Sequence, residues 1–145
     1  MKILFLDIDG VMNCQETAGL SCKYRIFDRE PTRLLSEILA KTETEVVISS
    51  SWRIGISIKE FKEIFHRQGL PGDRIIGYTP RLYHEGRLRG DEIKLWLEQN
   101  ASPDAVYAIL DDSDDMGELI HRLVQTNYRI GLTGIVAERI IALLR

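Results

Sequence analysis

The sequence has few cysteines and no long apolar run. Its 145 residues include two cysteines, Cys14 and Cys22. No apolar stretch approaches the roughly 20 residues that a membrane-spanning helix needs, and the apolar run after Met1 is too short for an export signal. Two cysteines do not form a disulfide framework. We therefore expect free thiols, a cytoplasmic location and no association with a membrane.

The sequence also lacks a strong excess of positive or negative charge and a cluster of histidines. The formal net charge is −3, so the protein as a whole is not expected to attract nucleic acid or an anionic membrane. The three histidines and two cysteines show no spacing typical of zinc ligands. Repeats, low-complexity segments and linkers are also lacking. The length and ordinary composition therefore predict one globular domain over residues 1–145.

What the sequence does contain is an alternation of short apolar runs and segments with helical spacing. The apolar runs predict strands at 2–6, 45–49, 74–78, 105–110 and 124–130. Helices are predicted to begin at Pro31, after a Ser57–Glu60 capping box, after Asp91 and after Thr133, with another over 116–123. This alternation predicts a three-layer, Rossmann-like α/β domain with a parallel sheet of about five strands.

Polar residues gather where these strands are predicted to end. Ligands of such sheets bind beyond the carboxyl ends of the strands. Acids and hydroxyls follow the first, second and fourth strands, and an arginine precedes a helix: Asp7, Asp9, Gly10, Ser49, Ser50, Ser51, Arg53, Asp111, Asp112, Asp115 and Arg89. We therefore expect these side chains to share one edge of the sheet.

Carboxylates that share one edge need a counter-charge. Two like charges about 4 Å apart repel by about 4 kcal/mol at an effective dielectric constant of 20. Oxygen ligands without histidine or cysteine favour Mg²⁺, which binds through a few carboxylates and substrate phosphate. An acid held beside Mg²⁺ can attack phosphorus, and a second acid two residues later can exchange protons with the leaving group and water. The acids expected at this edge of the sheet therefore predict a site for phosphate chemistry.

Several other residues suit a phosphate at this edge. Gly10 lets the backbone turn tightly beside it, and a serine hydroxyl can hold its oxygens. Arg89 offers a bidentate cation, and Arg53 can do the same for the substrate. We therefore predict that Gly10, Ser51 and Arg53 bind substrate.

Four motifs in order resemble those of the haloacid dehalogenase-like hydrolase superfamily. They are Asp7-Ile8-Asp9-Gly10-Val11, the serines of VVISSS, Arg89 and LDDSDD at 110–115. ISSSWR, RGDEI and LDDSDDM also resemble the small phosphatase-type domains associated with RNA repair proteins, relatives of the phosphatase half of polynucleotide kinase-phosphatase. The resemblance covers about three-quarters of the chain.

The resemblance implies a role for each matching residue. Asp7 would be the nucleophile and Asp9 the general acid and base. Magnesium would be held by Asp7, the backbone carbonyl of Asp9 and an acid of the fourth motif. For this acid we favour Asp111, with Asp112 or Asp115 in support.

Two of the motifs leave alternatives open. The phosphate-binding hydroxyl of the second motif is that of Ser49 or Ser50, because the predicted strand end is uncertain by a residue or two. The cation of the third motif is Arg89, with Lys94, inside the following helix, as the competing candidate.

The chain has no room for a large cap domain. About twenty residues, 13–30, separate the first motif from the first predicted helix. Capless members have an open site, which suits macromolecular substrates or needs an oligomer to cover it. We therefore expect a phosphorylated partner and leave an oligomer open.

The substrate is constrained by the resemblance of ISSSWR and by the missing cap. A nucleotide or a nucleic-acid phosphate end is the first hypothesis, and a small phosphometabolite or phosphoprotein is the second. A catalytically silent Mg²⁺-dependent binding or regulatory module is an alternative of another class. Dehalogenase chemistry also uses an aspartate nucleophile, but the second acid, Asp9, favours phosphate.

Overall fold

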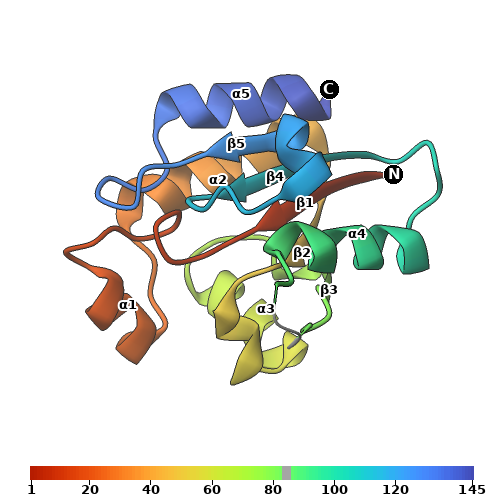
Figure 1. Ribbon diagram of the computed structural model, residues 1–145. Coiled ribbons are helices and arrows are strands. Elements are labelled where there is room, and N and C mark those ends of the chain that lie inside the picture. Colours follow the sequence, from red (N-terminus) through yellow and green to blue (C-terminus); the bar gives the residue numbers. More distant parts are fainter. Residues whose placement is uncertain (83–85) are drawn as a thin grey trace.

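Five parallel strands form the centre of the protein (Figure 1). The structure is a computed structural model, and it describes residues 1–82 and 86–145. The strands are β1 (Lys2–Leu6), β2 (Glu45–Ile48), β3 (Ile75–Tyr78), β4 (Val106–Asp111) and β5 (Leu123–Gln125), in the order β3-β2-β1-β4-β5. The predicted parallel sheet of about five strands is confirmed.

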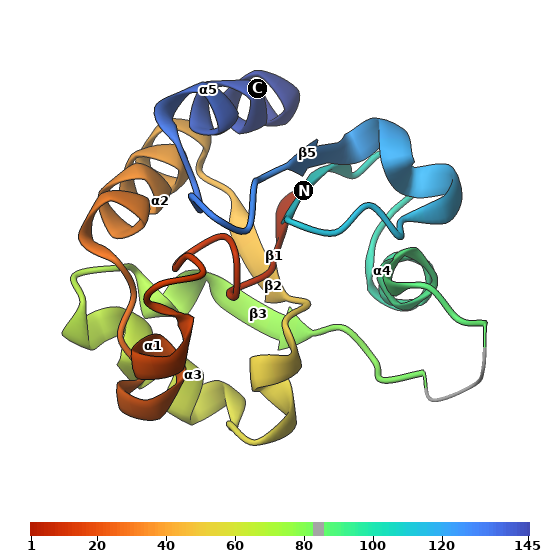
Figure 2. The same ribbon diagram turned by 60° about the vertical axis from the view of Figure 1, so that its left-hand side comes forward.

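Helices cover both faces of this sheet because its central strands are apolar on both sides. Leu4 and Leu6 of β1 belong to a core shared with α2 (Arg29–Thr42), α3 (Ile58–Arg67) and α5 (Gly134–Leu144). Ile3 and Phe5 point to the other face, where they pack against α4 (Arg89–Asn100). Figure 2 shows α2 and α5 on one side of the sheet and α4 on the other. These are the three predicted layers, and the described residues contain no separate cap domain.

The helix starts follow the predicted signals with small shifts. Ser57 caps α3, because its Oγ accepts a hydrogen bond from the Glu60 N–H. α2 begins at Arg29, two residues before Pro31. α4 begins at Arg89, so Asp91 is not its N-cap but its third residue, where its carboxylate accepts the Leu88 N–H. α5 follows Thr133 as predicted, although the Thr133 side chain makes no capping hydrogen bond.

The predictions for residues 116–130 were only partly right. The helical spacing over 116–123 forms a 3₁₀ helix, η3 (Gly117–Arg122), because little of it is buried: Ile120 is 48% exposed. Leu123 then enters β5, which ends at Gln125 rather than at 130. The residues beyond make a turn closed by an isolated bridge between Asn127 and Gly131. β5 is an edge strand and pairs with β4 alone, so its three residues complete the sheet on that side.

A short helix lies where the sequence predicted only a loop. α1 (Ala18–Tyr24) has seven residues, and Ser21 is its buried residue. Because no apolar stripe faces the core, the periodicity of its sequence gave no helical signal. None of the helices in residues 1–82 and 86–145 combines the length and apolar character needed to span a membrane.

Candidate active site

The sheet register lines up three of the predicted site residues. Leu6 of β1 pairs with Ile48 of β2 and with Leu110 of β4. The next residues, Asp7, Ser49 and Asp111, therefore lie in one row across three neighbouring strands. Since side chains alternate along a strand, all three project to the face that α4 covers.

Asp7, Asp111 and Asp112 form an acidic cluster at this edge. One carboxylate oxygen from each lies within 4.8 Å of the others. Asp7 is 5% exposed and Asp111 is fully buried. The cluster lies where the chain leaves β1 toward β2 and β3 on one side and later returns to β4 on the other. Such a reversal of strand order opens a crevice at the ends of the strands, where α/β proteins bind ligands.

Arg89 bridges two of these acids. Its Nη1 lies 3.2 Å from Oδ1 of Asp7 and 2.7 Å from Oδ2 of Asp111. As the first residue of α4, Arg89 also donates its backbone N–H to Asp115 Oδ2 at 3.2 Å. The start of α4 thus delivers a cation to the acids at the sheet edge.

Gly90 makes this approach of α4 sterically feasible. Its N–H donates to the Asp115 carbonyl at 3.0 Å. A Cβ at this position would lie 2.1 Å from the Met116 carbonyl oxygen. Any side chain at Gly90 would therefore push α4, and Arg89 with it, away from the acidic cluster.

The electrostatics of the cluster are incompletely balanced. Burial raises the pKa of Asp7 well above its ordinary value, the charge of Asp111 adds to this, and Arg89 opposes it. Burial likewise raises the pKa of Asp111. Burial alone would lower the pKa of Arg89, but the attraction of Asp7 and Asp111 outweighs it and raises that pKa overall. One guanidinium thus does not neutralise two buried carboxylates.

The donor set fits a hard divalent cation. The converging atoms of the cluster are all carboxylate oxygens, the ligands that Mg²⁺ prefers. Gly10 helps assemble them, because it has a positive φ of 78° and a Cβ there would lie 2.4 Å from Asp112 Oδ2. The residual negative charge of Asp7 and Asp111 is what a bound divalent cation would compensate.

Asp9 lies beside the cluster and is held by two donors. Its Oδ1 accepts hydrogen bonds from Asn13 Nδ2 at 3.0 Å and from the Trp52 indole N–H at 3.1 Å. Asn13 is fully buried and in turn contacts Ser21 Oγ at 3.0 Å and accepts the Gly10 N–H at 2.9 Å. This network fixes the Asp9 carboxylate relative to the turn after β1.

The serines after β2 have different surroundings. The Oγ of Ser49 is buried and has no hydrogen-bond partner among the described residues. Ser50 Oγ accepts the Trp52 N–H and caps the 3₁₀ helix η1 (Ser51–Ile54). Ser51 is exposed at the start of that helix. Of the two hydroxyls predicted to bind phosphate, that of Ser49 has no partner among the described residues, whereas that of Ser50 already accepts one hydrogen bond and keeps its O–H to donate.

Arg53 is not brought to the acidic cluster. Its guanidinium is buried and donates to the backbone carbonyls of Ser49, Ser50 and Thr79. It also pairs with Glu92 at 3.1 Å. Arg53 therefore ties the ends of β2 and β3 together, which is an arrangement different from the predicted contact with substrate.

Lys94 also lies apart from the acids. It follows Arg89 by five residues and so projects about 140° around the helix from it. It is exposed and forms an ion pair with Glu118. Between the two cations proposed for the third motif, Arg89 is the one in contact with Asp7.

Sequence reasoning missed two residues of the site, Asn13 and Trp52. Nothing in the spacing of Asn13 distinguishes it from a loop residue. Trp52 directly follows the serine run. It is buried and packs against Phe27 and Phe61, and its indole N–H donates to Asp9. An aromatic donor next to a predicted phosphate loop is the signal that could have indicated it.

Fold and site together define a haloacid dehalogenase-like protein of the hydrolase superfamily, with paired acids after β1 and a further acid at the end of β4. The family described as the HAD domain in Swiss Army Knife RNA repair proteins matches residues 3–135, and the chain belongs to this family. The resemblance predicted from the four motifs is thereby confirmed. No curated protein and no solved structure matches the chain.

Removing one charge from the cluster is expected to stabilise the metal-free protein. A raised pKa of Asp7 favours folding below its ordinary pKa, and this contribution is lost as the pH rises through the folded-state pKa. Asp7→Asn should therefore raise the Tm in EDTA at pH 7, by about 2–4 °C for each kcal/mol of relief. The difference should shrink toward pH 4, and Mg²⁺ should stabilise the wild type more than the variant. Thermal unfolding followed by circular dichroism tests this, and a lower Tm of the variant in EDTA at pH 7 would contradict it.

Proposed function

We propose that this domain hydrolyses phosphate monoesters with Mg²⁺, through an aspartyl phosphate on Asp7. The observation that carries the proposal is the shared contact of Arg89 with Asp7 and Asp111, with Asp112 alongside. A nucleotide or a nucleic-acid phosphate end is the substrate that the RNA repair context of the family favours.

The residues that would hold Mg²⁺ are Asp7, Asp111 and Asp112, with the backbone carbonyl of Asp9. When bound, the metal would neutralise negative charge and polarise a phosphoryl oxygen. The carboxylate of Asp7 is buried in an environment that disfavours its ionised form. A cation at this position would therefore favour the ionised carboxylate that acts as nucleophile.

The protein side chains supply the two chemical steps. First, the Asp7 carboxylate attacks phosphorus, the ester P–O bond breaks, and Asp9 donates a proton to the leaving oxygen. Second, Asp9 takes a proton from water, the resulting hydroxyl attacks phosphorus, and the bond to Asp7 breaks to release inorganic phosphate. Because Asn13 and Trp52 both donate to Oδ1 of Asp9, Oδ2 is the oxygen that would exchange the proton.

Charge on the transferring group would be held by Arg89 and Ser49. The Arg89 guanidinium already contacts Asp7 and has further N–H groups for phosphoryl oxygens. The unpartnered hydroxyl of Ser49 lies in the same row, one strand away. Such preorganised donors stabilise the transition state more than the ground state when they face the developing charge.

A phosphatase assay tests the proposed function directly. We expect the wild type to hydrolyse p-nitrophenyl phosphate in Mg²⁺ but not in EDTA, and Asp7→Asn to lose at least about 10³-fold in kcat. A panel of nucleotides, oligonucleotides with 3′- or 5′-phosphates, sugar phosphates and phosphopeptides then ranks substrates by kcat/KM. Preference for the sugar phosphates or phosphopeptides would support the alternative phosphatase hypotheses. No hydrolysis of any ester, with Mg²⁺ binding retained, would instead indicate a binding or regulatory module.

Arg89 and Lys94 provide a matched pair of cations on one helix. Arg89→Ala should lower kcat about 10²–10³-fold, because it removes a donor that faces the phosphoryl group. Lys94→Ala should change kcat less than about twofold, because its ion pair with Glu118 is exposed. Steady-state kinetics with p-nitrophenyl phosphate distinguish the two variants. Equal losses would contradict the assignment of Arg89 to the third motif.

The hydrogen bond from Trp52 to Asp9 should matter most for a poor leaving group. Trp52→Phe keeps an aromatic ring but removes the indole N–H, and a hydrogen bond to a charged group contributes about 1.5–3 kcal/mol. We expect kcat/KM for an alkyl phosphate to fall about 10-fold or more. The fall for p-nitrophenyl phosphate should be smaller, because its leaving group departs without a proton. Trp96→Phe, in the core beside Phe5, is the control: a similar dependence on leaving group there would refute the role of Trp52.

A further inference from the structure

A hollow of about 350 Å³ lies beside Asp9, at the end of the molecule toward which β1 runs. Figures 1 and 2 show α1 at this end. Residues at the C-terminal end of α1 form one side of the hollow and residues in and after η1 form the other. Its lining residues are Asp9, Cys22, Arg25, Ser51, Trp52, Ile54, Gly55 and Ile56.

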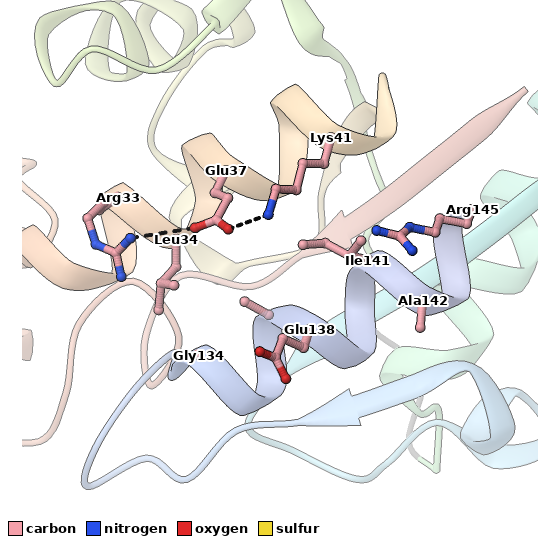
Figure 3. Close-up of a pocket in the computed structure, with 10 residues that line it drawn as sticks. Arg33, Leu34, Glu37, Lys41, Gly134, Glu138, Ile141, Ala142 and Arg145 are labelled. Carbon is pink, nitrogen blue, oxygen red and sulfur yellow. Dashed lines mark hydrogen bonds and ion pairs between the residues drawn. The ribbon is translucent and has the colours of Figure 1, made fainter.

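A larger hollow, of about 430 Å³, has no connection to the chemistry. It lies between α2 and α5 (Figure 3), and none of the acidic cluster, Asp9 or Arg89 lines it. The charged side chains of α2 at its rim already pair with one another, Arg33 with Glu37 and Glu37 with Lys41. Of these two hollows, the one beside Asp9 is therefore the one that bears on the reaction.

The position of Asp9 in the wall gives this hollow a role in the reaction. Asp7, Asp111 and Arg89 do not line it, so it extends from the site on the side of Asp9. Under the proposed function, on which this step rests, Asp9 protonates the oxygen of the leaving group. The group attached to that oxygen must then lie next to Asp9, in or across this hollow.

The walls combine apolar surface with a cation and hydroxyl. Trp52, Ile54 and Ile56 supply the apolar part, and Ile54 is 52% exposed although it is a large aliphatic side chain. Arg25 supplies a positive charge, and Ser51 a hydroxyl. The volume is at the lower end of ligand pockets, roughly 300–1,000 Å³. Such walls suit a small leaving group with a flat apolar part and a nearby anion.

We propose that this hollow binds the nucleoside next to the scissile phosphate, and that Arg25 recognises the following phosphodiester. A nucleoside has a planar base for the apolar wall, and polar atoms of its base and sugar for the Ser51 hydroxyl. The next phosphodiester of an oligonucleotide supplies the anion that a guanidinium binds well. A sugar phosphate lacks the planar base, and a mononucleotide lacks the second phosphate. Arg25 is thus the residue that determines specificity for an oligonucleotide end.

The backbone around Arg25 links this recognition to Asp9. Arg25 ends α1 in the left-handed conformation, with φ 53° and ψ 49°, and its N–H donates to the Ser21 carbonyl. Ser21 Oγ accepts a hydrogen bond from Asn13, which also donates to Asp9. The residue that meets the leaving group and the residue that protonates its oxygen are therefore fixed by one hydrogen-bonded chain.

Arg25→Gly is the variant that tests the proposal with least risk to folding, because glycine readily adopts a left-handed backbone. The readout is the ratio of kcat/KM for a trinucleotide with a 3′-phosphate, or with a 5′-phosphate, to that for p-nitrophenyl phosphate. We expect this ratio to fall about tenfold or more, mainly through KM of the trinucleotide. The control, Arg67→Ala, removes an exposed arginine at the end of α3 and should leave the ratio unchanged.

A binding measurement without turnover gives a second readout. Cys22 is exposed and lines the hollow, whereas Cys14 does not. In the Asp7→Asn background, the trinucleotide should slow N-ethylmaleimide labelling of Cys22 but not of Cys14, as followed by mass spectrometry. Adding Arg25→Gly should weaken this protection, and inorganic phosphate alone should give none.

The two readouts separate the inference from the proposed function. The inference would be overturned, and the phosphatase proposal left intact, by the following result. The wild type hydrolyses p-nitrophenyl phosphate, Arg25→Gly leaves the ratio of the two kcat/KM values unchanged, and the trinucleotide does not protect Cys22. Protection of Cys22 that depends on Arg25, without hydrolysis of any ester, would support the nucleotide-binding hollow and overturn the phosphatase. Equal protection by a sugar phosphate or a phosphopeptide would overturn the assignment to oligonucleotides.

Discussion

The contact of one guanidinium with two buried carboxylates is the constraint on which the site depends. Parallel pairing of β1 with β4 brings Asp7 and Asp111 to the same sheet edge, where burial and mutual repulsion disfavour their ionised forms. Arg89 offsets part of this cost, and it reaches the acids only because α4 begins close to the sheet. The absence of a side chain at Gly90 is what permits that start. The position of the start of α4 therefore determines how far the charge of the two acids is offset.

The part of the site predicted from sequence is the part fixed by strand pairing. Apolar runs predict the strands, and parallel order brings their carboxyl ends together, so acids and a serine were expected at one sheet edge. The pattern left open whether the serine is Ser49 or Ser50, and the choice of Asp111 came from the family resemblance. Arg89 was found for a similar reason, since a helix start is recognisable and its first turn lies at the same edge. These predictions needed no knowledge of side-chain conformation.

The residues that were missed or placed differently depend on details that periodicity does not carry. Asn13 and Trp52 reach Asp9 from a loop and a 3₁₀ helix, where spacing gives no direction. Arg53 was expected at the substrate, but the free carbonyls at the ends of β2 and β3 take its donors. The helical spacing of 116–123 formed only a 3₁₀ helix, of which little is buried, since Ile120 is exposed. In each case the position of the residue depended on the groups around it in the fold, which the periodicity of the sequence does not show.

With no cap among the described residues, the proposed function leaves recognition of the leaving group to α1 and η1, which line the hollow beside Asp9. The acidic half of the site is rigid, because Asp7 and Asp111 are buried and Arg89 joins them. Under the proposed function, this half of the site would act on the phosphate group alone and would not distinguish one ester from another. Discrimination must then come from groups that meet the leaving group, and these lie on α1 and η1 on either side of Asp9. Since Asn13 ties Asp9 to Ser21 of α1, a leaving group that fits this hollow also meets a correctly oriented acid. Under the proposed function, substrate choice and protonation would thereby be coupled without a separate domain.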